Sequence, residues 1–189
     1  ETAFKLGTHD HSRVSTRMGS EKLDGLTLLL LTLPGIAFTY NGDEIGMDDH
    51  LGIGWDDTID PWACNANPET FRDFSRDPQR TPYQWDGTVN AGFNTGSKPF
   101  IQVHPNFEKN NLEAQITVDK SHFKFYKSLL LLRKNETFVS GDFMSKALNE
   151  NVFGYLRSLG SETLVVLVNL GNISETVNIK DLTVKWDED

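Results

Sequence analysis

The fold is decided by residues 3–40, AFKLGTHDHSRVSTRMGSEKLDGLTLLLLTLPGIAFTY. A short apolar run at residues 3–6 opens this stretch and predicts a short buried strand. The leucines of residues 21–33 then recur at helical spacing until Pro34-Gly35 ends the pattern. Residues 36–40 form a compact apolar run of β-branched and aromatic residues, which is typical of a strand. Strand, helix and strand in this order predict a parallel sheet of an α/β fold.

The next segment, residues 41–120, has no sustained hydrophobic period and is rich in Gly, Asp, Pro and Asn. A loop of this length is uncommon inside a compact domain unless it is an active-site lid or a binding loop. We therefore expect residues 41–120 to form a functional loop. After it, Ser121 is expected to cap a second amphipathic helix that ends at Arg133-Lys134, as Ser20 is expected to cap the first helix.

The pattern changes again after residue 137. Four short strand-like runs follow, at residues 152–157, 163–169, 175–179 and 182–186. Turn residues such as Gly160-Ser161 and Gly171-Asn172 separate them, at a spacing typical of an antiparallel sandwich. The sequence therefore predicts a small all-β domain over residues 138–189, and we expect its end to be incomplete.

The composition is that of an acidic globular chain. Its 189 residues carry a formal net charge of −9 and no run of Lys or Arg, which argues against nucleic acid or an anionic membrane as a partner. The longest apolar stretch, residues 26–33, is much shorter than a bilayer span, so no transmembrane segment is expected. These features favour a neutral or small substrate.

Other features bear on the compartment and on the ends of the chain. Sequons at Asn135 and Asn172 are candidate glycosylation sites and favour a secreted or cell-surface protein, with a lipid anchor left open. Cys64 is the single cysteine, so no internal disulfide is expected; a lone thiol and a partner in upstream sequence are the two alternatives. The chain begins on a strand-like segment at Glu1 without an initiating Met, and we expect this start to be a cut.

Four stretches carry the candidate chemistry: residues 7–13 (GTHDHSR), 42–47 (GDEIGM), 75–86 (SRDPQRTPYQWD) and 90–96 (NAGFNTG). Together they resemble the last part of the catalytic barrel of the α-amylase superfamily of glycoside hydrolases, and within it the α-glucosidases and oligo-1,6-glucosidases. The resemblance implies an α/β fold in which residues 1–137 form the C-terminal portion of a (β/α)8 TIM barrel, its last two βα units. In such barrels the loops that leave the C-terminal ends of the strands build the active site, a role implied here for residues 41–120.

The resemblance also implies roles for individual residues. Asp10 is implied to be the carboxylate that stabilises the transition state by holding hydroxyls of the glucosyl ring. His9 is implied to bond a ring hydroxyl beside it, and Arg80 to reach into the same subsite. Arg13 is implied to brace Asp10 or approach the sugar, with a solvated surface arginine as the alternative. The chemistry suits Asp10, because an ionised carboxylate accepts charge-assisted hydrogen bonds that strengthen as the ring flattens toward an oxocarbenium ion.

Several residues of the loop have structural alternatives. Salt bridges that only pin the loop are the favoured interpretation for Arg76 and the alternative for Arg80. Asp43 and Glu44 are expected to stabilise the turn after the second strand. The tryptophans of the loop are candidates for stacking on sugar faces, although core packing is expected for at least two of them: Trp55, Trp62 and Trp85.

No cofactor is predicted within these residues. The chain has no Cys/His cluster of the kind that binds zinc. The acidic pairs Asp48-Asp49 and Asp56-Asp57 lack the alternating spacing of a calcium loop. Glycine-rich phosphate motifs and the GxSxG elbow are missing as well. The prediction for metal ligands is therefore none, and calcium stays a candidate only for an upstream segment.

The sequence thus predicts the C-terminal segment of a retaining α-glucosidase that acts on maltose, sucrose or short α-glucosides. A retaining enzyme needs a carboxylate nucleophile and a facing acid, and the resemblance implies that both lie upstream of Glu1, so the chain alone is expected to be inactive. The missing N-terminal part is then its main protein partner. Two alternatives remain: a non-catalytic binding protein of the same lineage, such as a transporter heavy subunit or a surface receptor, and one cleaved part of an assembled protein.

Overall fold

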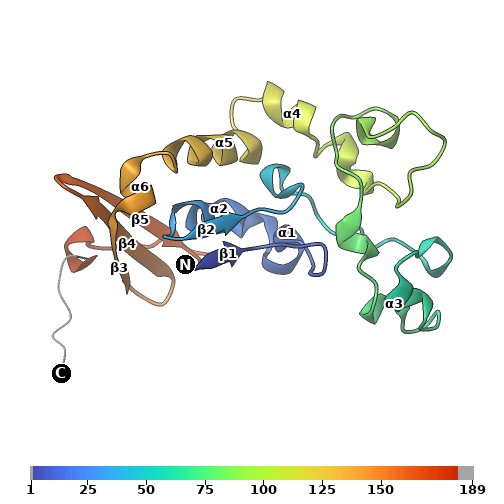
Figure 1. The fold of residues 1–189 in the computed structure, drawn as a ribbon, viewed down its shortest axis with the longest axis horizontal. Coiled ribbons are helices and arrows are strands. Elements are labelled where there is room, and N and C mark those ends of the chain that lie inside the picture. The colour runs from blue at the N-terminus through green and yellow to red at the C-terminus, as the bar shows by residue number, and fades with distance from the viewer. Residues whose placement is uncertain (1, 183–189) are drawn as a thin grey trace.

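A computed structural model describes residues 2–182 of the chain (Figure 1). The helices are α1 (Val14–Met18), α2 (Leu23–Thr32), α3 (Pro61–Cys64), α4 (Leu112–Thr117), α5 (His122–Leu132) and α6 (Glu136–Ser140). The strands are β1 (Ala3–Lys5), β2 (Ile36–Phe38), β3 (Asp142–Ala147), β4 (Val152–Leu159) and β5 (Glu162–Asn169). The 3₁₀ turns are Ser20–Lys22, Asp43–Ile45, Trp55–Asp57, Phe71–Asp73, Asp77–Arg80, Val89–Gly92, Pro105–Glu108 and Ile179–Leu182. The molecule is elongated, with the sheet β3–β5 at one end, β1, β2, α2 and α5 in the middle, and the long loop at the other end (Figure 1).

The predicted strand, helix and strand are confirmed as a parallel unit. β1 and β2 pair in parallel with Phe4 opposite Ala37. Ala37 also packs against the cluster that joins α2 to α5, built from Leu31, Tyr126 and Leu129. The central strand residue therefore faces the two helices, as in one unit of an α/β layer.

The prediction of a buried strand at residues 3–6 is wrong, because Ala3 and Lys5 are exposed and Phe4 is only half-buried. The apolar residues of β2 are exposed as well. Ile36 is 42% exposed and Phe38 is 56% exposed, although both lie in β2. Side chains alternate between the two faces of a strand, so these two point away from the face on which Ala37 packs. Among the described residues the sheet has only β1 and β2, and the two large apolar side chains of β2 on its second face are exposed.

One of the two predicted helix caps is confirmed. Ser121 accepts a hydrogen bond at 3.2 Å from the backbone N–H of Lys124 and so begins α5. Ser20 does not cap α2. It lies in a 3₁₀ turn that leads into the helix without a side-chain capping bond. The end of α5 is tied to the end of α2, because Arg133 donates to the carbonyl of Leu31 at 2.7 Å.

The C-terminal part is a single antiparallel sheet in the order β3-β4-β5. β4 and β5 match the predicted runs at 152–157 and 163–169, whereas β3 was not predicted. The strand predicted at 175–179 is wrong, because these residues pair with no strand and lead into the turn Ile179–Leu182. The strand predicted at 182–186 lies outside the described residues from position 183 onward. The described chain therefore shows one small antiparallel sheet and no second layer of a sandwich.

This sheet packs on the α/β part through α2. Its core contains Phe138, Tyr155, Val166 and Val168, and leucines of α2 such as Leu28 pack against it. The Tyr155 hydroxyl also hydrogen-bonds the Thr32 hydroxyl at the end of α2. The domain boundary predicted at 137/138 falls inside α6, whose residue Phe138 belongs to the core of the sheet. The division into two domains stays a prediction.

The long loop contains short helices and turns but, in the described chain, no strand. Buried acidic side chains hold it in place. Asp77 is 1% exposed, and its Oδ2 accepts hydrogen bonds from the Thr58 hydroxyl at 3.0 Å and from the backbone N–H groups of Ile59 at 2.8 Å and Asp60 at 3.1 Å. A carboxylate that accepts three such bonds orders a segment that has no ladder of its own. The loop is thereby brought against the residues that follow β1.

Candidate active site

Asp10 stands in a turn directly after β1. Its backbone N–H donates to the Thr8 hydroxyl at 3.2 Å, and Thr8 also contacts His11 across the turn at 2.9 Å. The side chain of Asp10 is 45% exposed. The carboxylate is thus presented beyond the end of the strand, where α/β folds place their functional groups.

Arg80 reaches this carboxylate from the long loop. Its Nη2 donates to Asp10 Oδ1 at 3.0 Å, and its Nε donates to the backbone carbonyl of His9 at 2.8 Å. His9 approaches from the other side, with 3.3 Å between its Nε2 and Asp10 Oδ2. The structure therefore brings together three of the four residues predicted for the site, Asp10, His9 and Arg80.

Arg13 lies elsewhere. It is 1% exposed, its guanidinium lies 4.8 Å from the centre of the Tyr40 ring, and its Nη1 donates to the carbonyl of Asn41 at 2.7 Å. The alternative of a solvated surface arginine is wrong, because the side chain joins the turn after β1 to the turn after β2 inside the protein. The implied roles of Arg13, bracing Asp10 or approaching the sugar, stay predictions, and this degree of burial disfavours the contact with a sugar.

Arg76 is a second arginine on Asp10 that the sequence did not assign to the site. Its Nη1 donates to Asp10 Oδ1 at 2.9 Å. The rest of its guanidinium is paired with Asp60, through Nε to Oδ2 and Nη2 to Oδ1, each at 2.8 Å. Arg76 thus forms a salt bridge within the loop, but the prediction that it only pins the loop is wrong, because the same side chain also binds Asp10.

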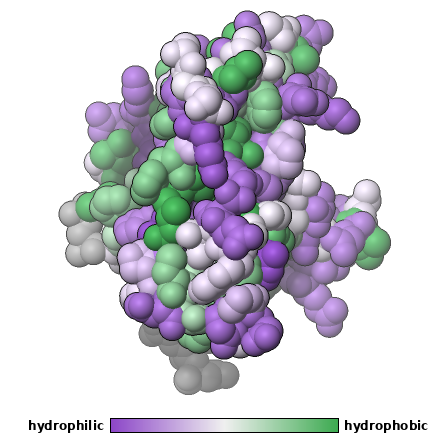
Figure 2. Space-filling view, turned by 90° about the vertical axis from the view of Figure 1, so that its right-hand side faces the viewer, coloured by the Kyte–Doolittle hydropathy of each residue, from purple (hydrophilic) through white to green (hydrophobic). Residues whose placement is uncertain are grey.

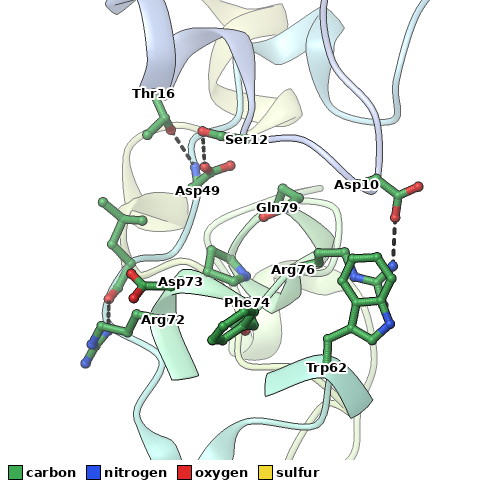
Figure 3. A pocket seen from close by; sticks show the side chains of 13 residues that line it. Asp10, Ser12, Thr16, Asp49, Trp62, Arg72, Asp73, Phe74, Arg76 and Gln79 are labelled. Atoms are coloured by element: carbon green, nitrogen blue, oxygen red, sulfur yellow. Dashed lines mark hydrogen bonds and ion pairs between the residues drawn. The ribbon is translucent and has the colours of Figure 1, made fainter. Parts of the chain in front are cut away.

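Asp10 and Arg76 lie on the wall of a cavity of about 420 Å³ (Figure 3). Its lining residues are Asp10, Ser12, Thr16, Asp49, Leu51, Trp62, Arg72, Asp73, Phe74, Ser75, Arg76, Pro78 and Gln79. This volume lies in the range of small-molecule sites. The surface at the loop end of the molecule is largely hydrophilic with hydrophobic residues interspersed (Figure 2). Polar groups beside aromatic ones suit a carbohydrate, which has hydroxyl edges and apolar faces.

The electrostatics keep Asp10 ionised. Its partial burial raises the pKa of the carboxyl, but the hydrogen bond from Arg76, the charges of His9 and Arg76 and the hydrogen bond from Arg80 outweigh that effect and leave the pKa below its ordinary value. The hydrogen bonds from Arg76 likewise hold the pKa of Asp60 well below its ordinary value, although burial opposes them. An ionised Asp10 accepts hydrogen bonds and does not donate them.

The tryptophans of the loop pack less deeply than expected. Trp62 is 61% exposed and Trp85 is 49% exposed, so the expectation that at least two of the three belong to the loop core is wrong. The Trp62 ring lies under the guanidinium of Arg76, 4.1 Å from its centre (Figure 3). Trp55 packs edge-on against Phe71. An arginine is thus the observed partner of the most exposed of the three loop tryptophans.

The acidic residues of the turns serve the backbone. Glu44 accepts a hydrogen bond from the N–H of Gly42 at 3.0 Å, and Asp43 accepts one from the N–H of Tyr40 at 2.8 Å. Asp57 pairs with Lys98 at 2.8 Å.

In the part of the chain that the structure describes, no group of three or more His, Cys, Asp or Glu side chains is arranged to hold a metal ion. Within residues 2–182, no helix has the length and apolar character needed to cross a bilayer.

Sequence reasoning missed Asp60 altogether. A local signal was present, since Asp60 precedes Pro61 and accepts a bond from the backbone N–H of Trp62, the pattern of an N-cap followed by proline. That signal explains the start of α3 and not the pairing with Arg76, which depends on how the loop folds back on itself.

Comparison with known proteins identifies the lineage. The family model of the α-amylase catalytic domain matches residues 1–142. Maltase 1 of Drosophila virilis is 42% identical over 177 residues, which cover 93% of this chain and 28% of that protein. The α-glucosidase of Apis mellifera is 39% identical over 175 residues, which cover 92% of this chain and 31% of that protein. Among solved structures, a trehalulose synthase MutB variant in complex with Tris matches with a TM-score of 0.79 and 31% identity, over 89% of this chain and 34% of that one.

The chain spans about a third or less of the length of these relatives. The family model nevertheless covers most of its residues, including the whole candidate site. The chain therefore belongs to the α-amylase family of glycoside hydrolases.

Proposed function

We propose that this chain is part of a retaining α-glucosidase that releases terminal α-linked glucose from maltose, sucrose or short α-glucosides. One observation carries the proposal. Asp10 and Arg80 lie 70 positions apart in the sequence, yet Arg80 binds the carboxylate of Asp10 at the edge of a cavity. Maltases and α-glucosidases are among the relatives of the chain, which supports glucosides as the substrate class.

In this proposal Asp10 grips the glucosyl ring. Its Oδ2 is available to hydroxyls of the sugar, and His9 beside it bonds a further hydroxyl. Arg80 has N–H groups beyond the two that bind His9 and Asp10, because a guanidinium carries five donors. Hydrogen bonds that strengthen as the ring becomes an oxocarbenium ion stabilise the transition state more than the substrate, and this difference raises the rate.

The nucleophile and the general acid belong, in our proposal, to a part of the full-length protein outside these residues. The retaining mechanism places two carboxyl groups on either side of the glycosidic bond, and the aligned region covers only 28% and 30% of two of the relatives. The remaining strands of a (β/α)8 barrel would also cover the open face of β2, where Ile36 and Phe38 are exposed. Residues 1–189 alone are then inactive.

We further propose that the protein is secreted or displayed at the cell surface. The relatives from Anopheles gambiae and Aedes aegypti, at 42% and 38% identity, are named salivary α-glucosidases. The sequon at Asn172 lies on the exposed surface after β5, as expected for an N-glycan in the secretory pathway.

The test compares the full-length protein with its Asp10→Asn variant on maltose and a chromogenic α-glucoside. We expect hydrolysis with retention of configuration, and a loss of kcat by about 10³-fold in the variant with unchanged folding. Asp142→Asn, an exposed aspartate of β3 at the opposite end of the molecule, is the matched control. A folded full-length protein that hydrolyses no α-glucoside refutes the proposal and favours a binding protein of the same lineage.

A further inference from the structure

We propose that Arg76 is a positioning residue for Asp10 and that the buried carboxylate of Asp60 holds Arg76 in the orientation this requires. The proposal rests on the function proposed above, in which Asp10 grips the sugar. It assigns the loop residues Asp60 and Arg76 a part in the reaction, although neither has to touch the substrate.

The first step is the fixation of Arg76. The side chain of Asp60 is 0% exposed, and both of its oxygens are used by Arg76, at 2.8 Å from Nε to Oδ2 and at 2.8 Å from Nη2 to Oδ1. The backbone N–H of Arg76 donates to the same Oδ2 at 2.8 Å. A bidentate pair of this kind fixes the plane of the guanidinium as well as its position.

The second step is the stacking on Trp62. The guanidinium carbon lies 4.1 Å from the centre of the Trp62 ring, within the range of a cation–π contact. Trp62 is itself placed by Asp60, which accepts the N–H of Trp62 at 3.2 Å. Asp60 thus positions both partners of the stack: it binds the edge of the guanidinium, and the Trp62 ring contacts its face.

In the third step, the fixed guanidinium of Arg76 positions the carboxylate of Asp10. With Nε and Nη2 committed to Asp60, Nη1 is aimed at Asp10 Oδ1 and meets it at 2.9 Å. Arg80 binds the same oxygen at 3.0 Å. Both arginines therefore converge on Oδ1, while Oδ2 faces His9 at 3.3 Å. The clamp on one oxygen fixes the rotation of the carboxylate and presents the other oxygen to the substrate.

The arrangement explains why a carboxylate on a turn can be preorganised. The side chain of Asp10 is 45% exposed and has little packing of its own, whereas the side chain of Arg76 is 20% exposed and anchored in the loop. Asp10 and Arg76 lie 66 residues apart, on the turn after β1 and in the long loop. Groups that act on a transition state must be held within a fraction of an ångström, and a small displacement lowers the rate strongly.

The experiment uses the full-length protein with two variants, Arg76→Ala and Arg76→Lys. Arg76→Ala removes every contact of the guanidinium and leaves the buried Asp60 with backbone N–H donors only, those of residue 76 and Trp62. Arg76→Lys keeps a cation beside Asp60 and lacks the planar fork needed to bind Asp60 and Asp10 together. Lys98→Ala, which breaks the exposed pair with Asp57 in the same loop, is the matched control.

We expect kcat of both Arg76 variants to fall by about 100-fold, with KM within about threefold of the original value. Added guanidinium ion at millimolar concentration should restore part of kcat in Arg76→Ala and not in Arg76→Lys. Crystal structures of the variants should show the Asp10 carboxylate rotated from its original position. Lys98→Ala should keep kcat within about twofold, since exposed ion pairs contribute little.

The crystal structures separate this inference from the proposed function. An Asp10 carboxylate that keeps its position in both Arg76 variants overturns the positioning role, whatever the activity of the protein. A kcat that stays within threefold in both variants also overturns it. Failure of the unmodified protein to hydrolyse any α-glucoside refutes the proposed function alone, because the rotation of Asp10 is still measured.

Discussion

Arg80 binds both the side chain of Asp10 and the backbone of the residue before it. Its Nη2 donates to the Asp10 carboxylate at 3.0 Å, and its Nε donates to the carbonyl of His9 at 2.8 Å. One guanidinium therefore fixes both the side chain and the backbone of the turn after β1. A lysine has the charge for the first contact but not the geometry for both.

The substitution Arg80→Lys in the full-length protein is therefore expected to lower kcat/KM for maltose by about 10- to 100-fold. Steady-state kinetics on purified, folded enzyme measure this. The control is Arg17→Lys, because Arg17 donates to the backbone carbonyls of Leu6 and Ser12 at the two ends of the same turn and does not bind the Asp10 carboxylate. Equal losses in both variants would mean that Arg80 only keeps the turn in place.

The carboxylate of Asp60 predicts how stability depends on pH. Hydrogen bonds from Arg76 hold its pKa well below the ordinary value of about 3.9, against the opposing effect of burial. A group whose pKa is depressed on folding stabilises the folded state above its unfolded pKa, and this contribution is lost as the pH falls toward the folded pKa. Between pH 7 and pH 5 the contribution of Asp60 is fully present, and it declines below about pH 4.

Asp60→Asn should therefore lower the free energy of unfolding at pH 7 by about 1–3 kcal/mol, and the gap to the unmodified protein should close as the pH falls from about 4 to 2. Urea titrations at a series of pH values measure the gap. Asp57→Asn is the comparison, since Asp57 forms an exposed pair with Lys98 and its loss should cost much less. A gap of constant size across this pH range would show that the charge of Asp60 is not what stabilises the loop.

The sequence predicted the elements that have a strong local signal. The leucine spacing of residues 21–33 and the cap at Ser121 correctly placed α2 and α5, because a helix depends on residues three and four positions apart. β3 was missed, since its residues DFMSKA mix charged and apolar side chains and form a strand only by pairing with β4. The segment 175–179 has a strand-like alternation, yet Glu175 is held by the side chains of Asn149 and Asn151 and no ladder forms.

The residues of the candidate site likewise divide into those with a local sequence signal and those whose position depends on the folded loop. Asp10, His9 and Arg80 were recognisable because they belong to motifs with a characteristic order. Asp60 was not, because an aspartate in a polar loop looks like many others until the loop folds and places it 2.8 Å from Arg76. Arg13 gave a misleading signal, since an arginine in a polar segment suggests exposure and only the structure shows it buried at 1%.

The turn after β2 depends on Gly42. Its φ is +93°, and a Cβ there would lie 2.5 Å from the sulfur of Met47 and 2.8 Å from Nη1 of Arg13. Gly42→Ala is therefore expected to destabilise the full-length protein by about 1–3 kcal/mol. Thermal unfolding measures the effect, with Gly54→Ala as the control, since Gly54 has φ −87° and no atom within 4 Å of an added Cβ. Similar unfolding temperatures for the two variants would contradict the strain argument.

The two sequons are expected to differ in use. Asn135 begins α6 and accepts the backbone N–H of Thr137 at 2.7 Å, and Thr137 is 1% exposed with its hydroxyl bonded to Glu162. Asn172 and Ser174 are exposed after β5. An acceptor sequon must be accessible to the transferase, so we expect a glycan on Asn172 and none on Asn135 in protein expressed through the secretory pathway.

Peptide mass spectrometry after glycosidase treatment should show the deamidated asparagine only at position 172, and Asn172→Gln should remove the mass shift contributed by this chain. A glycan found on Asn135 would mean that the residue is modified before α6 forms, and that the folded geometry does not decide which sequon is used.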